Sequence, residues 1–151
     1  MNLSLTFHDN GTRHRDLVFR FAAQEWICDS YYFAIDNELL PEFDDDRKIR
    51  AVLLRLHEQW LDAVQGLKIG ELAYLPFDFS DQSTRWLRCT ATSGGYLVVQ
   101  GWSNVEGWSF SPSAVGCLLH ELKNFNADGL ELELVENELQ DFIRESALLA
   151  A

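Results

Sequence analysis

The chain has 151 residues, of which 47% are hydrophobic and 24% charged, which is the composition of an ordinary globular protein and not of a disordered one. This length suffices for one domain with its own core, so we expect a single globular domain over residues 1–151. The formal net charge of −12 disfavours nucleic acid and membranes as partners, because phosphate backbones and anionic lipids are themselves negative.

Cysteine usage and the N-terminus predict a cytoplasmic location. The three cysteines, Cys28, Cys89 and Cys117, are widely spaced and form no CxxC pair, so neither a disulfide framework nor a zinc site is indicated. The first residues lack the basic and apolar regions of a signal peptide, and no apolar run is long enough to span a bilayer. We expect no metal and no cofactor.

The first strands are predicted by alternation of apolar and polar residues over 3–7 and 17–21. A three-residue loop at 10–12 would place Leu5 opposite Leu17 on the same face of a hairpin.

The segment after this hairpin has a weaker pattern. Residues 22–29 are ambiguous, whereas Tyr31, Phe33 and Ile35 alternate and predict a third strand that ends at Asp36-Asn37.

A helix follows, and it is the clearest element of the sequence. Asp44 or Asp45 is expected to cap its start, and Gly66 is well placed to end it. Capping and the helix dipole explain the acidic run at 44–46 better than a metal site, because the spacing of a calcium loop is absent. The apolar stripe consists of Ile49, Val52, Leu53, Leu56, Trp60, Val64 and Leu67.

Strands return after Gly70. Residues 73–79 alternate, and Pro76 marks either an edge strand or a break. Residues 85–92 and 96–103 flank Ser93-Gly94-Gly95, which predicts a hairpin.

The last third predicts a helix, a strand and a second helix. Ser111-Pro112 is a helix start, with an apolar face that extends to Phe125. Residues 130–134 alternate as a strand, and Asn137 with Gln140 resembles a capping box. The predicted fold class is therefore α+β, with an antiparallel or mixed sheet of about six to eight strands and three helices packed on it.

Gly-Trp-Ser occurs twice in the stretch GWSNVEGWSF, residues 101–110. If residues 104–106 form the tip of a hairpin, Trp102 and Trp108 lie opposite each other as a structural cross-strand pair. The alternative is an aromatic ligand pocket with polar groups from Arg88, Gln100 or His57. Its candidate walls are Trp86, Tyr96, Trp102 and Trp108.

No catalytic residue is predicted. His57-Glu58 and His120-Glu121 both lack the second histidine that the zinc protease motif requires four residues later. Residues 107–111 begin like the nucleophile elbow of hydrolases but end in serine instead of glycine. A catalytic triad assembled from distant residues stays open, since triads are recognised by geometry.

The segment 128–145 carries seven carboxylates against the single Arg144. Such a surface would steer a basic partner and raise its association rate, although a solvated surface has the same composition. The predicted contact residues are Glu131, Glu133, Glu136, Glu138 and Asp141.

A short acidic α+β chain without a catalytic motif is similar in general type to bacterial immunity and antitoxin proteins, which neutralise basic toxin domains. The leading hypothesis is accordingly a cytoplasmic, non-enzymatic protein that binds a basic protein partner. One alternative is a protein or enzyme that binds a small molecule in the aromatic pocket. Another is a structural subunit that associates with itself, for example as a homodimer.

Overall fold

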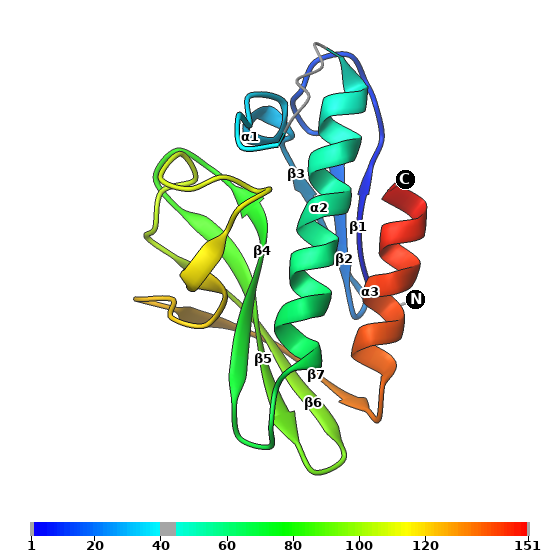
Figure 1. Cartoon of the computed structure of the whole chain (residues 1–151), viewed down its shortest axis with the longest axis vertical. Helices are drawn as coiled ribbons and strands as arrows, with labels where there is room; N and C mark the ends of the chain where they lie inside the picture. Colours follow the sequence, from blue (N-terminus) through cyan, green and yellow to red (C-terminus); the bar gives the residue numbers. More distant parts are fainter. Residues whose placement is uncertain (1, 40–44, 151) are drawn as a thin grey trace.

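The computed structural model describes residues 2–39 and 45–150, and these ranges contain seven strands and three α-helices (Figure 1). The α+β class is confirmed, but the strands form two antiparallel sheets instead of the one that was predicted. The elements in chain order are β1 (Leu3–Phe7), β2 (Leu17–Phe21), β3 (Gln24–Cys28), α1 (Tyr31–Ala34), α2 (Asp46–Gln65), β4 (Leu72–Phe79), β5 (Thr84–Thr92), β6 (Gly95–Ser103), the 3₁₀ turn η1 (Gly116–Leu119), β7 (Asn126–Val135) and α3 (Glu138–Ala150).

The N-terminal sheet has the order β1-β2-β3. Leu5 lies opposite Phe19 and not opposite Leu17, so the predicted three-residue loop is wrong. The connection is longer because polar side chains satisfy its backbone: the carboxylate of Asp9 accepts from Gly11 N, and the amide oxygen of Asn10 accepts from Thr12 N. The register differs from the prediction by two residues, which leaves the same side chains on the buried face.

The predicted third strand at 31–35 is also wrong, since the strand is β3 and residues 31–34 form α1. The carbonyl of Ser30 accepts from the amides of Phe33 and Ala34 and so starts a helical turn. Only Phe33 of the alternating trio is buried, whereas Tyr31 and Ile35 are 46% and 51% exposed. The alternation of apolar residues at 31–35 therefore looked like a strand pattern, although the segment is a helical turn that buries only one of these side chains.

Helix α2 begins and ends as predicted. Asp45 is the N-cap, and its carboxylate accepts from Arg47 N, while Gly66 is the C-cap. Asp44 lies outside the described residues. The helix crosses in front of the N-terminal sheet beside β4, and its Trp60 indole N–H donates to Pro76 O at 3.1 Å (Figure 1).

The second sheet has the order β4-β5-β6-β7. Strand β4 lies at its edge, which is one of the two alternatives that Pro76 left open, and Ser93 and Gly94 form the turn between β5 and β6. Trp86 and Leu87 are neighbours in β5 that point to opposite faces, and both are fully buried. Both faces of this sheet are therefore covered at β5.

One face of the second sheet is covered by an irregular segment that includes residues 110–115. The predicted helix at 111–125 is therefore wrong. The side chains of Asp36 and Gln59 hold this segment, accepting from Ser113 N and Val115 N respectively. Gly116, at φ +71°, interrupts any α-helix there. Phe110 of the same segment stacks on Trp86 with ring centroids 5.6 Å apart.

Strand β7 contains the predicted strand at 130–134 but begins earlier, at Asn126, and helix α3 follows it as predicted. The capping box differs, because Gln140 donates to the hydroxyl of Tyr96, while Glu138 accepts from Val135 N at 2.7 Å. Helix α3 lies beside β1, and its Ser146 hydroxyl accepts from Leu5 N at 2.8 Å.

One continuous cluster of buried side chains draws on both sheets, α2 and α3. Phe19 of the first sheet stacks on Phe77 of the second with ring centroids 3.8 Å apart, which joins the two sheets directly. Across the described ranges, no helix is long and apolar enough to cross a membrane.

Candidate functional site

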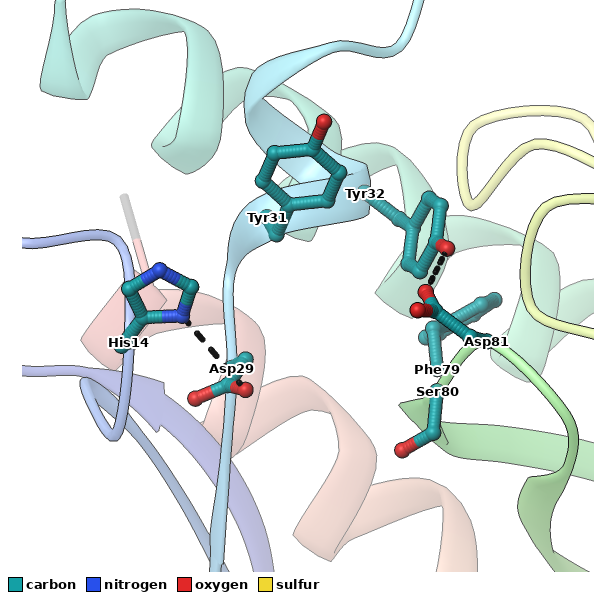
Figure 2. A pocket seen from close by; sticks show the side chains of 7 residues that line it. All are labelled: His14, Asp29, Tyr31, Tyr32, Phe79, Ser80 and Asp81. Carbon is teal, nitrogen blue, oxygen red and sulfur yellow. Dashed lines mark hydrogen bonds and ion pairs between the residues drawn. The ribbon is translucent and has the colours of Figure 1, made fainter.

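An open cleft of about 520 Å³ lies where the ends of three strands and α1 meet (Figure 2). His14 belongs to the β1–β2 connection, Asp29 follows β3, and Tyr31 and Tyr32 come from α1. Phe79, Ser80 and Asp81 at the end of β4 complete the lining. Two carboxylates and two tyrosines therefore face one space.

Buried hydrogen bonds fix the segments that carry these side chains. Asp16, which is 1% exposed, accepts from both the amide and the hydroxyl of Ser30 and so ties the start of α1 to the start of β2. His14 stands between Arg13 and Arg15, which both have left-handed backbones at φ 62° and 56°. Such conformations cost free energy in residues other than glycine and are frequent at functional sites.

Each carboxylate of the cleft already has a local partner. Asp29 accepts from Arg15 N, and its other oxygen lies 3.7 Å from His14 Nδ1. Tyr32 donates to the carboxylate of Asp81, and this hydrogen bond raises the pKa of Tyr32 to about 12. Tyr32 is thus a neutral donor at physiological pH, and it places its hydroxyl beside one of the two carboxyl groups of the cleft. Aromatic faces next to carboxylates suit a cationic group.

The acidic face, which we define as Glu131, Glu133, Glu136, Glu138 and Asp141, lies along β7, the turn after it and the start of α3. Two of its members have local partners: the carboxylate of Glu138 accepts a hydrogen bond from Val135 N, and the carboxylate of Asp141 lies 3.3 Å from Arg144. In the part of the chain that the structure describes, the carboxylates of Glu131, Glu133 and Glu136 make no hydrogen bond or ion pair. They are the unbalanced charges of this face.

The four aromatic residues of the predicted pocket lie apart. Trp86 and Tyr96 are both buried, on opposite faces of the second sheet, whereas Trp102 and Trp108 are 41% and 65% exposed. The predicted hairpin with its tip at 104–106 does not form, because β6 ends at Ser103 and Trp102 pairs with β5 and β7.

The glycines of the repeated Gly-Trp-Ser lie where another backbone segment comes too close for a side chain. A Cβ on Gly101 would approach Asn126 O to 2.3 Å, and a Cβ on Gly107 would approach Ser80 O to 2.4 Å. Each glycine therefore allows a close backbone approach, and the tryptophan that follows it points toward solvent.

The polar groups proposed for the aromatic pocket have structural partners. Gln100 donates to Asp128 at 2.9 Å, and the guanidinium of Arg88 lies over the ring of Phe125. His57 is fully buried in the core and is therefore not available to a ligand pocket.

His57 and Ser146 form a serine–histidine pair, with Nε2 and Oγ 2.6 Å apart. Nδ1 lies 2.7 Å from Leu53 O, which can only accept, so Nδ1 carries the proton and Nε2 accepts from the serine. Burial lowers the pKa of His57 to about 4. Because both residues are fully buried, the pair is closed to a substrate and serves the core.

A second polar cluster joins the two sheets around a smaller pocket of about 190 Å³. The guanidinium of Arg85 lies 3.8 Å from the ring centroid of Trp26 and 3.4 Å from the carboxylate of Asp128. The indole N–H of Trp26 donates to Asp78, whose pKa is raised by burial. The charges of this cluster are compensated internally, so it connects the sheets.

The three cysteines are free thiols, and two of them are buried. Burial raises the pKa of the Cys28 and Cys89 thiols and keeps them protonated, and the third free cysteine, Cys117, is exposed. Within residues 2–39 and 45–150, no three histidine, cysteine or acidic side chains gather as metal ligands.

Sequence reasoning missed the cleft, because its lining comes from three separate segments that share no motif spacing. No protein-family model, curated protein or solved structure matches the chain.

Proposed function

We propose that this chain is a non-enzymatic binding protein that engages a basic protein partner through the acidic face. The observation that carries the proposal is the set of unbalanced carboxylates, Glu131, Glu133 and Glu136, which follow one another along an exposed strand and turn. On other elements, several carboxylates are paired with arginine side chains. The arginines that form ion pairs with nearby carboxylates are Arg20, Arg47, Arg50, Arg55, Arg85 and Arg144.

Unbalanced negative charge on one face accelerates encounter with a positive surface and orients it. A basic toxin domain is one partner with the required charge. We also propose a cytoplasmic location, which the three free cysteines support, since reducing compartments keep thiols unpaired.

The test begins with capture of the partner from native cells and its purification. The association rate is then measured with the triple variant Glu131→Gln, Glu133→Gln and Glu136→Gln. We expect the rate to fall by about tenfold at low salt, and the difference to shrink at high salt.

The matched control is Glu38→Gln, Asp62→Asn and Glu121→Gln, which removes the same charge from exposed side chains on other elements. If the two triple variants lose the same amount, net charge alone guides the partner and the acidic face is not its site.

The second candidate function is binding of a small cationic ligand in the cleft of Figure 2. It is favoured by Tyr31, which is 46% exposed and stands edge-on to Tyr32 beside the two carboxylates. Arginine amide serves as the probe in calorimetric titration. Binding should be lost in Tyr31→Ala and kept in Trp108→Ala, an exposed aromatic residue outside the cleft; equal loss in both excludes the cleft.

A further inference from the structure

Strand β7 forms one edge of the second sheet, and its hydrogen-bonding pattern shows which groups face outward. The amide of Glu136 donates to Gly94 O, so these two residues are a hydrogen-bonded pair. In an antiparallel ladder such pairs alternate with pairs whose N–H and C=O groups point away from the partner strand. Glu131, Glu133 and Val135 belong to the second kind, opposite Val99, Leu97 and Gly95.

The amide of Val135 confirms this direction independently, because it donates to the Glu138 carboxylate and not to β6. The backbone groups of Glu131 and Glu133 point the same way. Among the described residues, none bonds to them. Four strong hydrogen-bonding groups are thus available along the free edge of β7.

The side chains of β7 determine which kind of strand could pair with its free edge. Glu131 and Glu133 point to one face with unpaired carboxylates. Leu130 and Leu132 point to the other face, where both are only half-buried. An added strand places its own side chains beside these on the same faces. Basic residues would therefore alternate with apolar residues in the segment that fits.

We propose that the free edge of β7 accepts a β-strand from the partner, with lysine or arginine beside Glu131 and Glu133 and apolar side chains beside Leu130 and Leu132. This inference rests on the proposed function and names the mode of binding. A second copy of the chain is a poor occupant, since antiparallel pairing of β7 with itself would bring glutamates together.

The probe is a capped seven-residue peptide in which lysine and valine alternate, added to the full chain labelled with ¹⁵N. We expect saturating peptide to slow hydrogen exchange at the amides of Glu131 and Glu133 by at least about tenfold, while exchange at the turn residue Ser93 stays unchanged. Unchanged exchange at Glu131 and Glu133, or no binding at millimolar peptide, overturns the inference.

Two further peptides separate strand addition from simple charge attraction. One is N-methylated at the lysines and the other at the valines, so both keep the charge. In an added strand only one residue type turns its N–H toward β7, so one modified peptide should bind and the other should not. Equal affinity overturns strand addition, and if Glu131→Gln and Glu133→Gln then abolish binding, the proposed function stands without it.

Self-association is tested in the same samples without peptide. Protection of the Glu131 and Glu133 amides that grows with protein concentration would assign the edge to a second copy and overturn the inference.

Discussion

The outer strands β1 and β7 differ in how their edges are protected: a helix covers the edge of β1, whereas the edge of β7 is exposed. All five residues of β1 are buried, and Ser146 of α3 accepts from its Leu5 amide. Strand β7 is mostly exposed and carries glutamates where β1 carries serine and threonine. An edge that a helix covers can be neutral, whereas an exposed edge needs charge to prevent pairing with other chains. The two strands can therefore be disturbed separately.

The largest effect is expected at the closed edge. Ser146→Ala leaves the buried Leu5 amide and His57 Nε2 without partners, and should lower the free energy of unfolding by about 3 kcal/mol. Denaturant titration measures it, with Glu145→Ala, an exposed neighbour on α3, as the control. A cost below about 0.5 kcal/mol would show that this bond does not hold the edge.

The second largest effect is expected from acid, which should lower the free energy of unfolding through His57, the partner of Ser146 at the covered edge of β1. Burial lowers the pKa of His57 from its usual 6.5 to about 4, so between these pH values the unfolded chain binds more protons than the folded chain. Stability is lost as pH falls through this window, by about 2 kcal/mol from this group between pH 7 and pH 5. The His57→Gln variant should show a shallower decline over that range than the exposed-site variant His120→Gln. Parallel declines would exclude His57 as the cause.

A substitution of Asp128 tests which contacts hold the start of β7 against the rest of the second sheet. Its carboxylate accepts from Gln100 and pairs with Arg85, both on the second sheet. Asp128→Asn should cost about 1 kcal/mol or less and should speed amide exchange over residues 126–130 without changing exchange in β1. Faster exchange in both strands would mean that the two edges are not independent.

The smallest effect on stability is expected at the open edge. Glu131→Thr with Glu133→Thr should change the free energy of unfolding by less than about 0.5 kcal/mol, because neither carboxylate has a partner. The double variant should instead associate with itself, as measured by sedimentation velocity. If it stays monomeric at concentrations where the wild type is monomeric, charge is not what keeps this edge free.

Local signals made some elements predictable. Helix α2 has its cap, its periodic stripe and its glycine within one segment, and the β5–β6 hairpin has its turn between two alternating runs. The acidic face could be named from the sequence because its charges are close in the chain, and its role stays a prediction. That Glu131 and Glu133 also offer free backbone groups depends on strand order, which no local pattern contains.

Distant partners explain the errors. The segment predicted as a helix at 111–125 is held irregular by Asp36, 77 residues before Ser113, and by Gln59, 56 residues before Val115. The division into two sheets likewise depends on where strand pairing stops, and alternation within each strand is the same in either arrangement. The lining of the cleft comes from three separate segments, so no local pattern in the sequence indicated it.

The contact between Ser146 and Leu5 spans 141 positions of the chain, which bears on how the protein is made. The ribosome synthesises β1 well before α3, so the β1 edge stays uncovered until the distant helix has been made. The hairpin of β1 and β2 can form early from local contacts, but its closure must await the distant helix. Slow translation before residue 138 would therefore prolong the interval in which a nascent chain exposes a neutral, pairing-competent strand.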